Sequence, residues 1–136
     1  MYQIKMIESH DLHNDGIKLL KSMINEEPIF YYNYNGKPYL KNSNIYFSIS
    51  HSIDKVACVI SDKIIGLDIE KIRDYDINLN KELKINANNN RDFFINYTKK
   101  EAYLKKNGLA LKDIYNIVPS NTITKVIDNY VISIAL

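Results

Sequence analysis

A short segment with two acids on one face constrains this chain more than any other feature. The segment reads Ile65-Gly66-Leu67-Asp68-Ile69-Glu70 and is predicted to be a strand. Because side chains alternate across a strand, Asp68 and Glu70 share one face, while the apolar residues beside them can pack into the core. Two acids at an exposed strand end are also common, so this pair alone leaves a purely structural role open.

A third acid lies on a predicted helix further along the chain. The helix is expected from about Arg91 to Asn107, with Asn90 as its cap and Gly108 as a left-handed stop. One stripe of this helix has members three and four residues apart, namely Phe94, Tyr97, Glu101, Leu104 and Gly108. An acid on an inward stripe needs a partner, because an unpaired buried carboxylate is costly. Lys105, four residues after Glu101, could supply an ion pair and would explain that acid without a metal.

The coincidence of these acids in one small chain indicates a site for a divalent metal ion. Carboxylates that converge repel one another unless a cation lies between them. Ligands that are all oxygen suit Mg²⁺, which also takes water and substrate phosphate oxygens. Zinc is disfavoured because no pair of His or Cys residues has ligand spacing. The candidate magnesium ligands are Asp68, Glu70 and Glu101, and a structural ion-pair cluster is the alternative.

The composition suits one globular domain, predicted to span residues 1–136. Hydrophobic residues make up 46% of the chain and charged residues 25%, with a formal net charge of +2. That charge is too small to indicate a nucleic-acid partner. No apolar stretch approaches the roughly 20 residues that cross a bilayer, and residues 1–8 do not read as a secretory signal. We therefore expect a cytoplasmic protein with neither a membrane nor a nucleic-acid partner.

The order of the predicted elements favours an α+β fold, with small antiparallel sheets packed against two main helices. The first helix is expected at residues 12–27. Strands are expected at residues 29–34, 45–50, 55–60, 64–70, 114–118, 122–127 and 130–135. Residues 61–63 should join two of these strands as a hairpin, and Asp128-Asn129 should form another hairpin turn. Residues 75–90 are polar and predicted to be a flexible loop, and no internal repeat is visible.

Hydroxyl groups and an imidazole gather at the end of one predicted strand, Ser48-Ile49-Ser50-His51-Ser52. They offer several hydrogen-bond donors to a phosphate. A serine hydrolase is disfavoured, because adjacent residues on a strand face apart and the chain has no Gly-x-Ser-x-Gly elbow. The turn Gly36-Lys37-Pro38 would be an ordinary exposed loop by itself and an anion contact beside a phosphate site. His10 and His13 precede the first helix and are predicted to be surface residues.

Taken in order, these segments resemble the 4'-phosphopantetheinyl transferase superfamily, as a shortened member of its surfactin-synthetase-type branch. The resemblance spans roughly residues 17 to 118. The matching runs are Gly36-Lys37-Pro38, Phe47-Ser48-Ile49-Ser50-His51-Ser52, Gly66-Leu67-Asp68-Ile69-Glu70, and Lys100-Glu101-Ala102-Tyr103-Leu104-Lys105 with Gly108.

The resemblance implies an enzyme that moves the 4'-phosphopantetheine arm of coenzyme A to a serine of an apo acyl or peptidyl carrier protein. The reaction would depend on Mg²⁺ and release adenosine 3',5'-bisphosphate. Glu101 would help to deprotonate the serine, and Lys105 would stabilise or protonate the leaving phosphate. The implied site residues are Asp68, Glu70 and Glu101 for the metal, Glu101 and Lys105 for catalysis, and Lys37, Pro38, Ser50 and His51 for the coenzyme. Of these, Ser50 and His51 would contact phosphates, and Lys37-Pro38 would line the adenosine side.

The chain departs from that family at several positions. Its N-terminal portion is shorter than in the longer branch and lacks most basic residues that grip the coenzyme's 3'-phosphate there. Lys18 and Lys21 are candidate substitutes, and Tyr97 stands where the family has tryptophan. One alternative is therefore a truncated relative that binds coenzyme A or a carrier protein without turnover. Another is a binding module with an ion-pair cluster in place of the metal, and a homodimer is expected if an apolar face is left uncovered.

Overall fold

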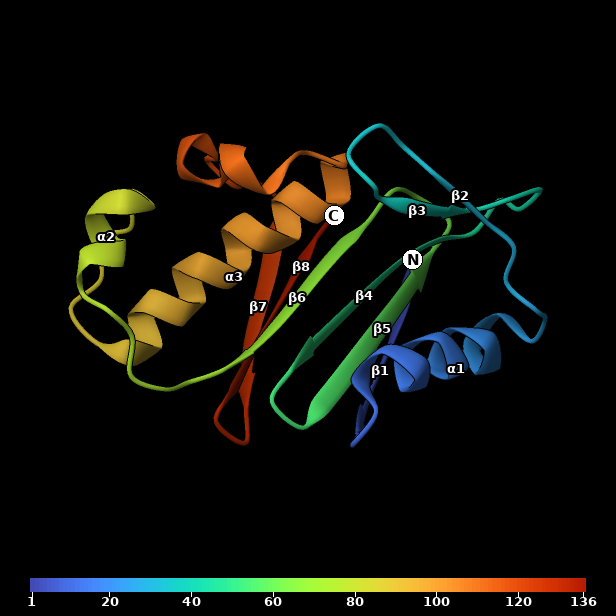
Figure 1. Ribbon diagram of the computed structural model, residues 1–136, viewed down its shortest axis with the longest axis horizontal. Coiled ribbons are helices and arrows are strands. Elements are labelled where there is room, and N and C mark those ends of the chain that lie inside the picture. The colour runs from blue at the N-terminus through green and yellow to red at the C-terminus, as the bar shows by residue number, and fades with distance from the viewer.

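Two three-stranded antiparallel sheets, each packed against one long helix, make up the computed structural model of residues 1–136 (Figure 1). The first sheet has the order β1-β5-β4, with β1 at Tyr2–Glu8, β4 at Tyr46–Ser52 and β5 at Lys55–Ser61. The second has the order β6-β8-β7, with β6 at Gly66–Lys71, β7 at Thr122–Ile127 and β8 at Tyr130–Ala135. The predicted α+β class, with small antiparallel sheets against two main helices, is confirmed.

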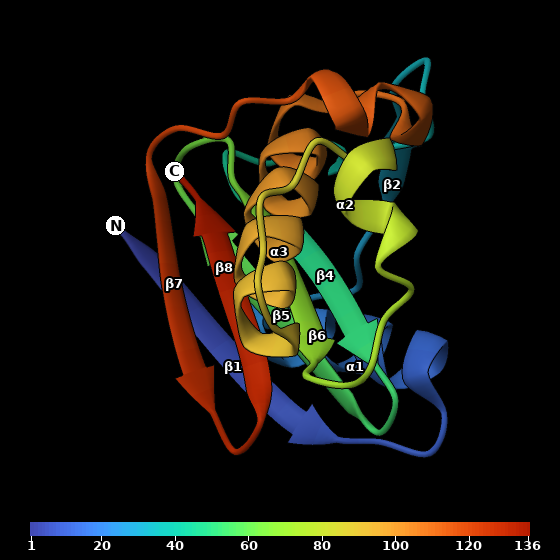
Figure 2. The same ribbon diagram turned by 90° about the vertical axis from the view of Figure 1, so that its left-hand side faces the viewer.

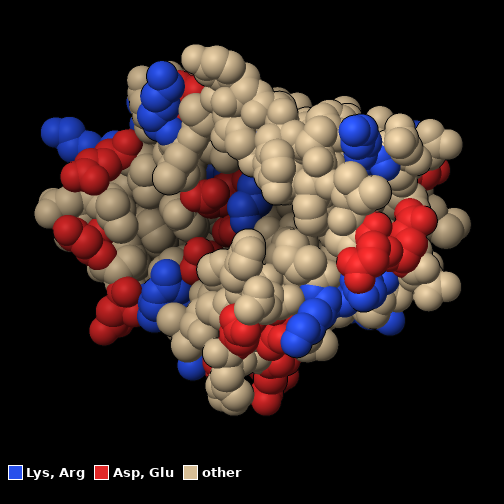
Figure 3. Space-filling model, turned by 45° about the vertical axis from the view of Figure 1, so that its right-hand side comes forward, with Lys and Arg blue, Asp and Glu red and all other residues tan.

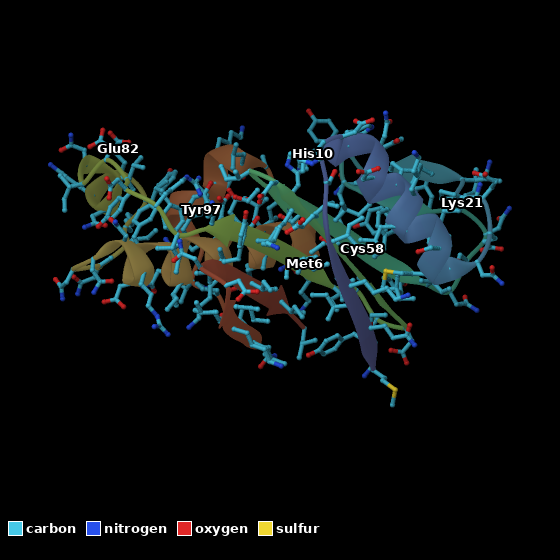
Figure 4. The ribbon with its side chains drawn as sticks, turned by 90° about the horizontal axis from the view of Figure 1, so that it is seen from below. Met6, His10, Lys21, Cys58, Glu82 and Tyr97 are labelled. Carbon is cyan, nitrogen blue, oxygen red and sulfur yellow. The ribbon has the colours of Figure 1, made fainter.

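Helix α1, Leu12–Ile24, covers the first sheet. Its Leu19 and Leu20 are buried in one cluster with Cys58, which lies beneath the helix (Figure 4). The helix ends before the predicted residue 27 because Asn25 adopts a left-handed conformation, with φ of 59°. Gly16 allows close contact with β4, since a Cβ atom there would lie only 2.9 Å from Ile49 Cγ2.

Helix α3, Asn90–Asn107, covers the second sheet (Figure 2). The cap is Asn89, not the predicted Asn90, and its side chain accepts a hydrogen bond from the backbone N–H of Asp92. Gly108 ends the helix with φ of 60°, as the sequence predicted. Both ends of this helix are therefore set by local sequence signals.

Gly66 fixes how closely α3 approaches β6. A Cβ atom at this position would lie 2.0 Å from the carbonyl oxygen of Ala102 and 2.4 Å from the backbone nitrogen of Lys106. No side chain larger than hydrogen fits there, so the strand and the helix pack backbone against backbone. This contact brings the acids of β6 next to Glu101 of α3.

Shorter elements complete the fold. Strands β2, Phe30–Tyr32, and β3, Pro38–Leu40, form a hairpin, and α2 spans Asn78–Glu82. The predicted flexible loop at residues 75–90 packs instead, because Tyr75 stacks on Phe93 with ring centroids 3.9 Å apart. The structure contains no helix with the length and hydrophobicity that crossing a membrane requires.

Three sequence predictions were wrong or incomplete. Residues 61–63 do not close a hairpin, because β5 is flanked by β1 and β4 while β6 pairs with β8. Residues 111–116 form a 3₁₀ helix, η1, where a strand was predicted at 114–118. Its segment buries Ile114 and Ile117, three residues apart, against Leu104. Strand β1 was not predicted.

The hairpin turn predicted at Asp128-Asn129 is confirmed. Both residues have positive φ, and the turn joins the paired strands β7 and β8.

The two halves of the chain share one topology. Each contains a strand, a helix and two further strands, and in each sheet the last strand lies in the centre. This structural repeat was not visible in the sequence, because the two halves share backbone arrangement without a recognisable residue pattern. The sheets meet where β4 lies along β6.

Three alternate serines of β4, here called the serine row, join the two sheets in place of a backbone ladder. The hydroxyl oxygens of Ser48, Ser50 and Ser52 accept hydrogen bonds from the backbone N–H groups of Leu67, Ile69 and Lys71, at 3.1, 3.1 and 3.0 Å. The matching spacing of two on both strands follows from strand periodicity. The serine row therefore fixes the register of β6 against β4.

We predict that Ser48→Ala destabilises the protein by about 1–3 kcal/mol, because it leaves the buried Leu67 N–H without a partner. The free energy of unfolding in urea measures this effect. Ser120→Ala is the matched control, since Ser120 is exposed. A Ser48→Ala variant as stable as the control would show that the serine row does not hold the sheets together.

Candidate functional site

Asp68 is the buried centre of the acid cluster. It projects from β6 and is only 4% exposed. Its Oδ1 accepts hydrogen bonds from Ser50 Oγ at 3.0 Å and from Lys105 Nζ at 3.3 Å. The strand alternation that the sequence predicted is observed, because Leu67 and Ile69 point to the opposite face and are fully buried in the core.

The second carboxylate oxygen of Asp68 has no partner. Oδ2 is buried and makes no hydrogen bond. Burial raises the pKa of Asp68 to about 7; Lys105 opposes this shift, while the charges of Glu101 and Glu70 add to it. A buried oxygen without a donor, next to further negative charge, is unfavourable in the ionised state. A cation at Oδ2 would give this oxygen a partner and would offset the repulsion from Glu70 and Glu101.

Glu101 is held by a tyrosine on its own helix. The carboxylate is buried, and Tyr97 donates a hydrogen bond from its hydroxyl to Glu101 Oε1 at 2.8 Å. The alternative of an ion pair between Glu101 and Lys105 is not observed, because Lys105 reaches across to Asp68 instead. Burial and the adjacent Glu101 together raise the pKa of Tyr97, so its hydroxyl stays a donor.

Glu70 lies at the outer side of the cluster. Its Oε2 accepts a hydrogen bond from Arg73 at 2.9 Å and another from Ser52 Oγ at 3.2 Å. The serine row thus contacts both acids of β6, Ser50 at Asp68 and Ser52 at Glu70. The acids are oriented by the same side chains that join the sheets.

The three acids gather without forming a closed ligand set. No group of three or more His, Cys, Asp or Glu side chains is arranged to hold a metal ion as it stands. Arg73 and Tyr97 each occupy one oxygen of the flanking glutamates, whereas Asp68 Oδ2 has no partner. The donor chemistry fits Mg²⁺, which prefers carboxylate oxygens and keeps several waters. Asp68, Glu70 and Glu101 as metal ligands stay a prediction.

A cavity of about 450 Å³ lies beside the acids, between α1, the β2–β3 hairpin, β4 and the end of α3. Part of its wall is aromatic, from Phe30, Tyr32 and Phe47. Its lining includes no acidic residue, and its basic residues are His13, Lys37, His51 and Lys105. The face in Figure 3 is hollowed, with acidic and basic side chains inside the hollow. Such a lining suits a ligand with an apolar ring and negative charge.

Three of the four predicted coenzyme-binding residues line this cavity, namely Lys37, Pro38 and His51. The ammonium group of Lys37 donates to the carbonyl oxygens of Lys106 at 2.7 Å and Ile65 at 3.5 Å. Burial, followed by the charge of Lys106, lowers the pKa of Lys37 to about 8. Its contact with a coenzyme stays a prediction, and its observed role is to tie the hairpin to the end of α3.

Ser50 occupies a different place from the other three. It is buried, and its hydroxyl is engaged with Asp68 and with the Ile69 N–H. The structure thus gives Ser50 a role in orienting an acid, and its predicted phosphate contact is not among the observed interactions.

Several contributors to the site were missed by the sequence reasoning, among them Ser52 and Arg73, which contact Glu70. Tyr97 could have been found, because it lies four residues before Glu101 on the same helical stripe. Ser48 could have been found from its spacing of two to Ser50 and Ser52, which places all three on one face of a strand. His13 was expected at the surface. It is exposed, and its side chain also lines the cavity.

We predict that the metal-free protein loses stability as the pH rises from about 4 to 7. Since the folded-state pKa of Asp68 is raised to about 7, the folded state binds more protons than the unfolded state in this window. The loss should be on the order of 1 kcal/mol per pH unit and should disappear in Asp68→Asn. Unfolding in urea with a chelator present measures it.

Asp113→Asn is the control for that measurement, because Asp113 is exposed. Adding Mg²⁺ at pH 7.5 should restore stability to the unmodified protein and not to Asp68→Asn. A stability that is flat between pH 4 and 7, or that ignores Mg²⁺ in both proteins, would contradict the buried, unsatisfied carboxylate.

Comparison with known proteins gives one informative match. No protein-family model matches the chain. The chain is similar to the 4'-phosphopantetheinyl transferase gsp of Aneurinibacillus migulanus, with 37% identity over 98 residues. The matched region covers 64% of this chain and 41% of that relative. The chain therefore spans well under two thirds of the length of the relative it matches.

Proposed function

Because the chain belongs to the 4'-phosphopantetheinyl transferase superfamily, we propose that it transfers the phosphopantetheine arm of coenzyme A to a serine of an apo acyl or peptidyl carrier protein. The other product is adenosine 3',5'-bisphosphate. The observation that carries this proposal is the partnerless buried Asp68 Oδ2, flanked by Glu70 and Glu101 and adjoining a cavity without acidic residues.

The acids would hold one Mg²⁺ ion. Asp68 supplies its free oxygen, while Glu70 and Glu101 each have one oxygen not engaged in a hydrogen bond to Arg73 or Tyr97. Bound Mg²⁺ would neutralise the charge of the coenzyme's diphosphate. Phosphoryl transfer needs positioning and charge neutralisation more than covalent help from the protein. This chain's own contribution is to fix the carboxylates through the serine row and Tyr97.

Glu101 and Lys105 would move the protons. The oxygen of the carrier serine attacks the phosphorus that bears the pantetheine arm, and the bond from that phosphorus to the bridging oxygen breaks. Glu101, directly or through a water, would help to take the serine proton, while Tyr97 holds its Oε1 in place. Lys105, 3.3 Å from Asp68 and also part of the cavity lining, stabilises or protonates the departing phosphate.

Two cavities beside the acids would hold the two ends of coenzyme A. The first, with Lys37, Pro38 and its aromatic wall, suits the adenosine end. The second, of about 420 Å³, is lined mainly by hydrophobic residues and includes Tyr97. Tyr97 and Lys105 lie about 12 Å apart along α3, at a rise of about 1.5 Å per residue. The acids would therefore lie between a cavity for the nucleotide and a cavity for the pantetheine arm.

A second candidate is a relative that binds coenzyme A or a carrier protein without turnover. Two observations favour it: Arg73 already neutralises Glu70, and the three acids do not form a ready ligand set. A cytoplasmic location and a homodimer stay predictions from the sequence.

We expect the protein, incubated with Mg²⁺, coenzyme A and an apo carrier protein, to increase the mass of the carrier by one phosphopantetheine group. Asp68→Ala and Glu101→Ala should lower the initial rate at least about 100-fold, since a charge-stabilising group is typically worth that much. Intact-protein mass spectrometry measures the gain.

Glu82→Ala is the control for this assay, because Glu82 is exposed on α2 and lines neither cavity. Its rate should equal that of the unmodified protein. Binding of coenzyme A without any mass gain would reject the transferase and support the second candidate.

A further inference from the structure

One basic side chain at the acid cluster has no part in the proposed chemistry. Arg73 follows β6 and donates a hydrogen bond from Nη1 to Glu70 Oε2 at 2.9 Å. The same nitrogen donates to the backbone carbonyl oxygen of Lys71 at 2.7 Å. The guanidinium also lies over the ring of Phe94, with Cζ 4.7 Å from the ring centroid. Three contacts therefore hold this cation against an acid that is predicted to bind a metal ion.

The partners of the three acids differ in charge. Two acids have a cationic partner, Lys105 at Asp68 and Arg73 at Glu70, whereas Glu101 has the neutral hydroxyl of a tyrosine. When all three carboxylates are ionised, the cluster and its two cations keep one net negative charge. A divalent ion bound there would make the net charge positive. Without Arg73 the cluster would keep two negative charges, which a divalent ion would neutralise in full.

Arg73 can leave Glu70 without stranding a buried group. The side chain of Arg73 is 44% exposed, and that of Glu70 is 17% exposed. Glu70 also accepts a hydrogen bond from Ser52, which does not depend on the guanidinium. An exposed ion pair contributes little to stability. A substitution at Arg73 should therefore change the binding of ions without unfolding the protein.

We propose that Arg73 competes with a divalent cation for Glu70 and thereby weakens the binding of that cation by the acid cluster. This inference rests on the proposed function, because it takes the three acids to be the metal site. The guanidinium neutralises one of only three carboxylates and repels a second cation nearby. Arg73 is therefore not a ligand, and it sets the affinity of the cluster for its ion.

Binding of Mn²⁺ tests the proposal, because Mn²⁺ takes the same kinds of oxygen ligand as Mg²⁺ and its free ion can be counted by electron paramagnetic resonance. At pH 8, without coenzyme, Arg73→Gln should bind Mn²⁺ roughly tenfold more tightly than the unmodified protein, because one repelling charge is removed. Arg73→Lys should keep the weak binding, because it keeps the charge. Arg91→Gln is the matched control, since Arg91 is the chain's other arginine and is exposed at the start of α3.

The outcomes separate this inference from the proposed function. Equal Mn²⁺ binding by Arg73→Gln and the unmodified protein overturns the role of Arg73 and leaves the transferase standing. Tight binding by Arg73→Lys, or by Arg91→Gln, also overturns it, because the effect then does not come from the charge at this position. Failure of every protein to bind Mn²⁺ overturns the metal site of the proposed function and the inference together.

Asp68→Asn shows where the ion binds. Added to Arg73→Gln, it should abolish the tighter binding, because the extra affinity belongs to the acid cluster. Tighter binding that survives Asp68→Asn places the ion elsewhere and overturns the proposal. Circular dichroism checks that each variant is folded.

Discussion

The serine row is the interaction on which both the fold and the site depend. Backbone hydrogen bonds end at the edges of β4 and β6, so the two sheets are joined there by the hydroxyls of Ser48, Ser50 and Ser52. A hydroxyl can accept and donate at once. Ser50 and Ser52 use this capacity to hold an amide of β6 and to donate to an acid of β6. The same two hydroxyl groups therefore join the sheets and orient the carboxylates.

The acid cluster is arranged so that its charge is only partly compensated. Lys105 balances one oxygen of Asp68, Arg73 balances Glu70, and Tyr97 gives Glu101 a neutral hydrogen bond. The negative charge that remains uncompensated lies on Asp68 Oδ2, which is buried and has no hydrogen-bond partner. Perturbed groups of this kind gather at functional sites, although ion-pair networks produce them as well. What favours function here is the adjoining cavity, whose lining carries only basic charge.

The sequence predicted the parts of this molecule that depend on local signals. Alternation in residues 65–70 predicted β6 and the shared face of its acids, and the left-handed Gly108 was expected at the end of α3. What it could not predict depends on contacts between distant elements. Lys105 pairs with Asp68 and not with Glu101, because the close packing of α3 on β6 brings Asp68 within reach. The cavity position of His13 was decided by the packing of α1 on β4, and η1 by burial every three residues.

Gly66 has a consequence that reaches beyond the turn freedom usually associated with glycine. Its missing side chain lets the strand rest on the carbonyl of Ala102 and the amide of Lys106. The absence of a Cβ atom at Gly66 therefore sets the distance between β6 and α3, and with it the separation between their carboxylates. A methyl group at this point would act as a wedge, moving the helix off the sheet and widening the gap across which the acids must cooperate. The arrangement of the three acids therefore depends on the close backbone packing of β6 on α3 as much as on which acids are present.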